Sequence, residues 1–210
     1  MTVADRHVRD FPLFPLGLVA LPSEAVPLHI FEERYKTMMN ECLDAEREFG
    51  IIWLSEEGLR DIGCACRIER VLQRSEDGRL NLLTRGTTPL RVIERQSHLP
   101  YPAGIVELLE DRHGDVDAEL GDQARSAYAE LVQRATDESP EEAELAAMDA
   151  YAMAARVDFG LDAKQALLDL RSEDARLRLV TRLFRAAVKR LDFVDRAQAR
   201  ARSNGKVRLG

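Results

Sequence analysis

Residues 11–35 read FPLFPLGLVALPSEAVPLHIFEERY, and they combine a strand-like half with a helix-like half. The first half is apolar but contains prolines at positions 12, 15 and 22. Because proline has no backbone N–H to donate to a strand ladder, this half is predicted to be an edge strand, an extended arm or a bulged start of a sheet. After the turn at Pro22-Ser23, the segment Ala25–Ile30 is predicted as another short strand.

The residues after Ile30 follow a helical period. Their apolar side chains fall on a single stripe, formed by Phe31, Tyr35, Met38, Met39 and Cys42. Glu32 and Glu33 stand in the first predicted turn, where carboxylates suit the positive end of the helix dipole. The stripe has two interpretations: it is the core contact between helix and sheet, or its methionines line an adaptable peptide groove. Trp53 also has two, as an interior packing residue or as an anchor in a binding groove.

Further strand patterns continue to residue 109. They are separated by turn residues and lie at Phe49–Leu54, Cys64–Leu72, Leu80–Thr84, Leu90–Ile93 and Ala103–Leu109. Between two of them, Ser75-Glu-Asp-Gly78 has hairpin chemistry, since glycine adopts positive φ without strain. Several short strands at this spacing favour a small, strongly bent antiparallel sheet or barrel.

From about residue 116 the apolar period becomes helical. Helices are predicted over Asp122–Ala135, from a capping box at Ser139-Pro-Glu-Glu142 to about Val157, over Asp162–Leu170, and onward from the cap Ser172-Glu-Asp174. The last of them has a buried stripe, formed by Leu177, Val180, Phe184, Val188 and Leu191. The fold class is therefore α+β, with a β-rich subdomain over 1–115, a helical bundle over 116–200 and a disordered tail over 201–210.

Composition indicates an ordinary soluble protein. Of the 210 residues, 45% are hydrophobic and 32% are charged, and no apolar run approaches the length of a membrane span. The start of the chain lacks the charged-then-apolar order of a secretory signal. The three cysteines, Cys42, Cys64 and Cys66, are an odd number, which argues against a disulfide framework and for a reducing compartment. A cytoplasmic location without a membrane partner is expected.

Charge is spread unevenly along the chain, whose formal net charge is −7. Residues 175–210 hold 11 basic and 2 acidic side chains. Four of the basic ones, here called the basic stripe, share a face of the last predicted helix: Arg178, Arg182, Arg185 and Lys189. The basic stripe either packs beside acidic segments and is otherwise solvated, or it binds nucleic acid. Because an acidic chain is a poor partner for phosphate backbones, nucleic-acid binding is the alternative function rather than the main one.

The chain lacks the motifs of several enzyme classes. It contains no G-x-x-x-x-G-K-[ST] loop for phosphates, no G-x-G-x-x-G for a dinucleotide and no G-x-S-x-G nucleophile elbow. Cys64 and Cys66 place two sulfurs on one strand face, but a structural zinc site normally has a second cysteine pair, so we predict buried core cysteines. No catalytic residue, metal or cofactor is predicted, and a small hydrolase is the competing enzymatic hypothesis.

The opening motif resembles the N-terminal domain of Lon proteases. The family pattern is close to P-L-F-P-L…P…P-L-x-I-F-E-x-R-Y, and this chain has Pro12-Leu-Phe-Pro-Leu16, Pro22 and Pro27-Leu-His-Ile-Phe-Glu-Glu-Arg-Tyr35. Residues 77–86 look like later strands of the same domain, and residues 164–168 are similar to part of its helical region. The resemblance spans about residues 11–195. Glu33 departs from it, at a position where proline is common in the family.

The resemblance implies a PUA-like bent antiparallel β-barrel with one inserted helix, followed by a C-terminal helical bundle. It also implies a non-catalytic module that recognises unfolded or tagged polypeptides, as an adaptor or quality-control factor beside a protease or chaperone. Since the chain has no P-loop and no recognisable Ser–Lys site, we expect a stand-alone Lon N-domain-like protein rather than an enzyme. The expected peptide contacts are Phe31, Glu32, Tyr35, Met38, Trp53 and Arg85. The alternative function is an RNA-binding PUA-like protein that uses the basic stripe.

Overall fold

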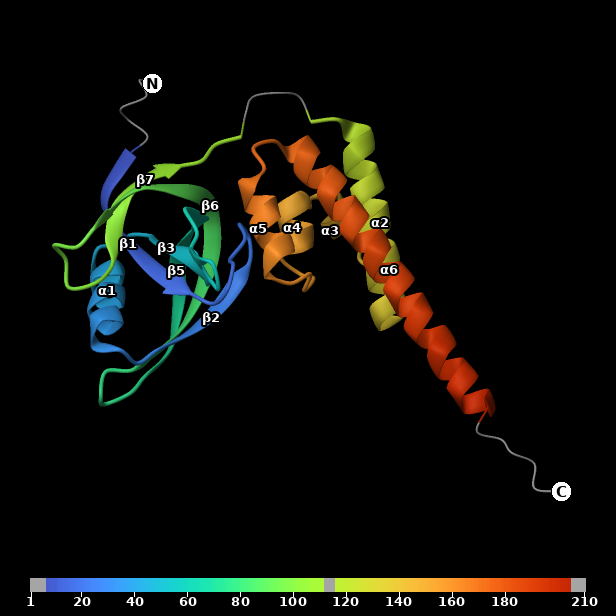
Figure 1. The fold of residues 1–210 in the computed structure, drawn as a ribbon, viewed down its shortest axis with the longest axis horizontal. Helices are drawn as coiled ribbons and strands as arrows, with labels where there is room; N and C mark the ends of the chain where they lie inside the picture. The colour runs from blue at the N-terminus through green and yellow to red at the C-terminus, as the bar shows by residue number, and fades with distance from the viewer. Residues whose placement is uncertain (1–6, 112–115, 205–210) are drawn as a thin grey trace. The chain divides into compact units, whose positions relative to one another are not determined.

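The computed structural model describes residues 7–111 and 116–204, which form two compact units. The first unit contains residues 7–111 and 154–172, and the second contains residues 116–153 and 173–204 (Figure 1). A single boundary near residue 115 is therefore too simple, because residues 154–172 group with the strands although they follow the start of the helical region.

The first unit is built mainly from strands. They are β1 (His7–Leu16), β2 (Ala25–Ile30), β3 (Phe49–Ser55), β4 (Gly58–Leu59), β5 (Ile62–Arg74), β6 (Leu80–Gln96) and β7 (Ala103–Leu108). All pairings are antiparallel except that of β1 with β3. The hydrogen-bonded order is β1-β7-β6-β5-β3-β4, with β2 on β6. Because β1 also pairs with β3, the path of pairings returns to its first strand.

The proline-containing strand β1 lies inside the sheet rather than at its edge. Pro12 stands opposite Ala103 on β7, and Pro15 stands opposite Ile52 on β3. The register with β7 shifts between Val8 and Phe11. Of the three alternatives for this segment, the bulged start of a sheet is the one observed, since the bulge lets a proline-rich strand keep neighbours on both sides.

Two predicted strands are joined in β6. Gly86 and Pro89 interrupt the local pattern, but the strand continues through both. The register between β5 and β6 shifts between Cys64 and Cys66, directly opposite this interval. Cys66 stands opposite Gly86 and Cys64 opposite Pro89, so β6 carries one extra residue here, and the interruption that the sequence indicates is a bulge within β6 rather than a break in it.

Helix α1 (Glu33–Asp44) covers the strands of the first unit with its apolar stripe (Figure 1). Its buried side chains are Tyr35, Met38, Met39 and Cys42. The predicted helix is confirmed, but Phe31 precedes its first turn and is exposed. The core-packing interpretation of the methionines is therefore the one that the structure supports.

The remaining helices differ from their patterns in their bounds. They are α2 (Ala118–Thr136), α3 (Glu142–Ala146), α4 (Ala150–Ala154), α5 (Leu161–Asp169) and α6 (Glu173–Asn204). The predicted single helix from the capping box at residues 139–142 to about residue 157 is divided into α3 and α4. Ser139 does not cap α3, because its hydroxyl donates to the Gln133 side chain instead and Glu141 occupies the N-cap.

The second unit is centred on the packing of α2 against α6. The Tyr128 and Phe184 rings meet edge-to-face, with centroids 5.4 Å apart. Most of the predicted apolar stripe of α6 is buried, while Leu191 near its end is partly exposed. Helix α6 extends through Asn204, so residues 201–204 are helical where a disordered tail was expected, and residues 205–210 lie outside the described residues. Within residues 7–111 and 116–204, no helix is both long and apolar enough to cross a membrane.

Candidate functional site

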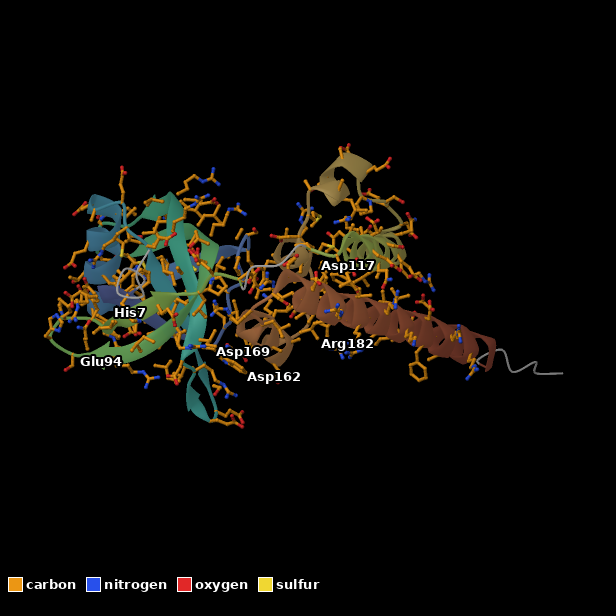
Figure 2. The ribbon with its side chains drawn as sticks, turned by 90° about the horizontal axis from the view of Figure 1, so that it is seen from above. His7, Glu94, Asp117, Asp162, Asp169 and Arg182 are labelled. Atoms are coloured by element: carbon orange, nitrogen blue, oxygen red, sulfur yellow. The ribbon has the colours of Figure 1, made fainter. Side chains whose placement is uncertain are left out.

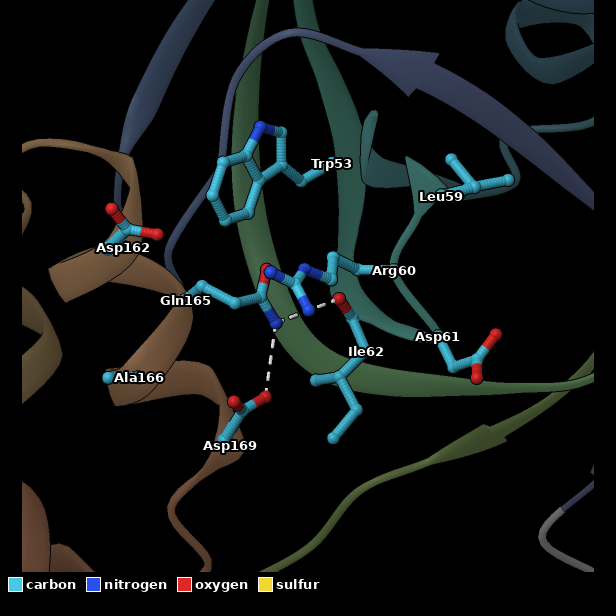
Figure 3. Close-up of a pocket in the computed structure, with 9 residues that line it drawn as sticks. All are labelled: Trp53, Leu59, Arg60, Asp61, Ile62, Asp162, Gln165, Ala166 and Asp169. Atoms are coloured by element: carbon cyan, nitrogen blue, oxygen red, sulfur yellow. Dashed lines mark hydrogen bonds between the residues drawn. The ribbon is translucent and has the colours of Figure 1, made fainter. Parts of the chain in front are cut away.

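A pocket of about 500 Å³ lies in the first unit, between the strand ends and helix α5 (Figure 3). Its lining side chains come from β3, the β4–β5 region and α5, and are Trp53, Leu59, Arg60, Asp61, Ile62, Asp162, Gln165, Ala166 and Asp169. The close-up shows α5 contributing Asp162, Gln165 and Asp169 from one side. Residues more than a hundred positions apart in the chain therefore meet at one site.

Trp53 supplies the aromatic surface of the pocket. It lies on β3, which pairs with β1 at this position and with β4 one residue later. The guanidinium carbon of Arg60 is 5.4 Å from the centre of the indole ring, within cation–π range. Arg60 is also held by Glu57 at 2.9 Å, and its backbone N–H donates to the Trp53 carbonyl at 3.0 Å. The β3–β4 hairpin thus fixes the ring and the guanidinium together.

Helix α5 supplies the polar wall. Gly160 allows the helix to begin abruptly, since its φ of +82° lies in the region that favours glycine. The wall is formed by residues spaced as i, i+3, i+4 and i+7, which share one face of a helix: Asp162, Gln165, Ala166 and Asp169. Figure 2 labels both aspartates on this helix. The opposite face packs Leu167 and Leu168 into the core.

Two polar contacts attach α5 to the strands. Lys164 pairs with Glu24 at 2.5 Å, and both side chains are largely buried. The Gln165 amide nitrogen donates to the carbonyl of Ile62 and to the carboxylate of Asp169, each at 3.1 Å. Gln165 is 7% exposed, and its side-chain oxygen Oε1 is buried without a hydrogen-bond partner among the described residues. A buried acceptor without a donor is unfavourable, so this atom calls for a ligand or water that supplies one.

The lining of the pocket is rich in polar groups. Its lining combines an indole ring, three carboxylates, one carboxamide and one guanidinium, and contains no serine, cysteine, lysine or histidine. An acyl-transfer site needs a nucleophile beside a base, and these lining residues do not provide that pair. Among the described residues, no group of three histidine, cysteine, aspartate or glutamate side chains is placed to hold a metal ion.

Two of the predicted peptide contacts lie at the start of α1. Phe31 is 60% exposed and stacks on His29, with ring centroids 5.9 Å apart. Glu32 occupies the N-cap position of α1 without a capping hydrogen bond, and its carboxylate pairs with Arg34 at 2.8 Å. Both are accessible to a partner, but neither lines the pocket at Trp53.

Two further predicted contacts belong to the core. The Tyr35 ring lies 4.4 Å from the ring of Phe14, and burial raises the pKa of the Tyr35 hydroxyl. Met38 is 0% exposed. Because both side chains lie on the buried face of α1, a bound peptide does not reach them in this structure.

Arg85, the last predicted contact, has its hydrogen bonds to a neighbouring strand and to the turn before β2. It pairs with both carboxylate oxygens of Glu69, at 2.5 and 3.1 Å, and donates to the Ser23 carbonyl at 2.8 Å. The hydrogen bond from Arg85 lowers the pKa of Glu69. Of the six predicted residues, only Trp53 lines the pocket.

The polar wall of α5 was not identified from the sequence. The pattern that indicates it is the i, i+3, i+7 spacing of hydrogen-bond acceptors within the predicted short helix.

The basic stripe lies on the surface, whereas the cysteines lie in the core. The four basic side chains are exposed along α6, and Arg182 projects from this helix (Figure 2). Arg178 pairs weakly with Asp174, at 3.9 Å. The cysteines Cys42, Cys64 and Cys66 are all buried, which confirms their prediction as core residues, and burial raises the pKa of the Cys64 thiol well above its ordinary range.

Comparison with known proteins relates this chain to the family that its opening motif resembles. The family model of the ATP-dependent protease La (LON) substrate-binding domain matches residues 10–186. Lon protease 2 of Myxococcus xanthus is 24% identical over an alignment of 190 residues, which covers 82% of this chain and 23% of that protein. The chain therefore spans about a quarter of the length of this curated relative.

Solved structures of Lon N-terminal domains have a similar fold. The crystal structure of a Lon N-terminal domain protein from Xanthomonas campestris has a TM-score of 0.61 and 25% identity, covering 80% of this chain and 94% of that one. The N-terminal domain of the Mycobacterium avium complex Lon protease has the same TM-score at 18% identity, covering 83% and 97% respectively. Since the family model covers most of its length, the chain belongs to the Lon substrate-binding domain family.

Proposed function

We propose that this chain is a non-catalytic polypeptide-binding module that acts as an adaptor or quality-control factor in the cytoplasm. Membership of a substrate-binding family supports the binding of polypeptides. Three buried, unpaired cysteines fit a reducing compartment. The partners would be unfolded or tagged polypeptides, delivered to a protease or chaperone.

The observation that carries this proposal is the pocket at Trp53. An aromatic ring beside several hydrogen-bond acceptors is typical of a peptide-binding site, because the ring supplies apolar contact area and the polar groups fix orientation. The pocket volume of about 500 Å³ is large enough for one or two side chains of an extended peptide rather than for a folded partner.

The experiment compares two neighbouring residues of β3. Trp53→Ala removes the indole from the pocket, whereas Leu54→Ala truncates an exposed side chain on the opposite face of the same strand. We expect Trp53→Ala to weaken binding of a labelled, permanently unfolded polypeptide by about 10- to 30-fold, the usual effect of losing a central aromatic contact. Fluorescence anisotropy measures the affinity.

Leu54→Ala is the matched control and should bind within about 2-fold of the wild type, as residues outside a binding centre usually do. Circular dichroism confirms that both variants are folded. Equal affinities for the wild type and Trp53→Ala would place binding elsewhere, and no binding by the wild type would remove the proposal.

A PUA-like barrel is part of the same proposal. The closed path of strand pairings, in which β1 meets both β7 and β3, supports it. In a closed barrel β1 has neighbours on both sides, and the unpaired strand edges would lie mainly at β2 and β4. A bound polypeptide would then contact side chains and would not add a strand beside β1.

RNA binding through the basic stripe is the second candidate, and the exposure of all four cationic side chains on α6 supports it. Such binding should weaken steeply as salt rises, because neutralised phosphates release counterions. We expect Arg182→Gln combined with Arg185→Gln to abolish an RNA mobility shift if this function holds. An RNA affinity that does not change with salt, or the absence of any shift, would exclude it.

A further inference from the structure

We infer that the Trp53 pocket takes a basic side chain of the bound polypeptide, preferably the guanidinium of an arginine. This inference rests on the proposed function and adds the class of residue that the pocket recognises. Three features support it: the charge balance of the pocket lining, the buried acceptor on Gln165 and the indole ring of Trp53.

The charges in the pocket do not cancel. Arg60 is neutralised by Glu57 at 2.9 Å, and Asp61 is neutralised by Arg95 at 2.8 Å. The two carboxylates of α5, Asp162 and Asp169, have no ion pair with any residue among 7–111 and 116–204. A ligand that lies against this wall therefore meets two carboxylates without a cationic partner, which favour a cation and repel a carboxylate.

Gln165 provides the second, independent observation. Its amide nitrogen is committed to Ile62 and Asp169, which orients the side-chain oxygen Oε1 as the remaining acceptor. This oxygen is buried and has no donor within the part of the chain that the structure describes. With the two carboxylates, the α5 wall presents acceptors only, and a guanidinium is a ligand group that presents donors only.

The indole explains the preference for arginine over lysine. A planar guanidinium stacks on an aromatic face while its N–H groups point outward to acceptors, whereas an ammonium makes a point contact. The chain itself places one guanidinium, that of Arg60, over the Trp53 ring. Arg60 also carries the one positive charge in the lining, so it opposes a cationic ligand.

The test uses a fluorescently labelled, unstructured polypeptide that contains arginines, and two versions in which the arginines are replaced by glutamine or by glutamate. We expect the wild type to bind the arginine version about 10-fold more tightly than the glutamine version, since charge-assisted hydrogen bonds are stronger than neutral ones. The glutamate version should bind more weakly than both.

Three variants make the result specific to the pocket. Asp162→Asn with Asp169→Asn should reduce the arginine-over-glutamine preference to within about 2-fold. Arg60→Gln should increase the preference, because it removes the opposing charge. Asp44→Asn removes an exposed aspartate at the end of α1 and is the matched control; it should keep the wild-type preference.

The outcomes separate the two claims. If the wild type binds all three polypeptides equally, or if the asparagine double variant keeps the full preference, the inference is wrong and polypeptide binding stands. If the wild type binds none of them, the proposed function fails and the inference fails with it. Circular dichroism melting of each variant shows whether a lost preference reflects lost folding.

Discussion

Gly86→Ala should destabilise the first unit by about 3 kcal/mol or more, in the upper range for overpacking a well-packed interior. A Cβ at this position would lie 2.1 Å from the Leu21 carbonyl oxygen and 3.1 Å from the Cys64 sulfur. The backbone is not free to retreat, because the Gly86 N–H donates to Glu24 and its carbonyl accepts from Ser23, each at 2.9 Å. Relief of the clash therefore requires these contacts to break.

Urea unfolding followed by tryptophan fluorescence measures this effect. Trp53 is the only tryptophan and lies in the first unit, so its signal reports on that unit. Gly17→Ala is the matched control, since a Cβ at Gly17 would meet no atom within 4 Å, and we expect its stability to stay within about 0.5 kcal/mol of the wild type. A Gly86→Ala midpoint equal to that of Gly17→Ala would contradict the close approach of β6 to Leu21.

Arg176→Met should destabilise the second unit by about 3–5 kcal/mol, the usual cost of removing one partner from a buried ion pair. Arg176 is 3% exposed, and its Nε and Nη2 donate to one Glu173 oxygen at 3.0 and 2.8 Å. Its guanidinium carbon lies 4.4 Å from the centre of the Tyr151 ring. The other Glu173 oxygen accepts from the backbone of Ala150 at 2.7 Å, so the substitution also disturbs the start of α4.

The loss of helical circular dichroism with urea measures this second effect. Arg178→Met is the control two residues along the same helix, where the side chain is 58% exposed and its Asp174 partner is 3.9 Å away. Exposed ion pairs contribute little, so we expect a much smaller change for Arg178→Met. Similar unfolding midpoints for the two variants would show that the Arg176–Glu173 pair is not a buried determinant of stability.

Local patterns were sufficient for much of the fold. The strand over Ala25–Ile30 and the buried stripe of α1 follow directly from short-range spacing. Spacing did not show that β6 continues through Gly86 and Pro89, because what holds this bulged stretch in the sheet is its pairing with β5, a different strand. Nor did it show that Ser139 bonds to Gln133 rather than capping α3. In each case a tertiary or medium-range contact outweighs the local preference.

The site was less accessible to sequence reasoning than the fold. Trp53 was identified because a single tryptophan is conspicuous, but Tyr35 and Met38 were included on apolar character alone, which does not distinguish core from surface. The partners of Trp53 on α5 are brought to it by contacts such as that between Gln165 and Ile62, 103 residues apart. A convergence of this kind depends on tertiary packing, so residue spacing does not reveal it.

Polypeptide capture at the pocket is the central claim, and the emission of Trp53 tests it most directly. An unfolded polypeptide without tryptophan is titrated into the wild-type protein, whose single indole lines the pocket. We predict a saturable shift of the emission, with the same midpoint as the anisotropy titration of the labelled polypeptide. Saturable anisotropy with unchanged Trp53 emission would contradict the claim, because the polypeptide would then bind away from the pocket.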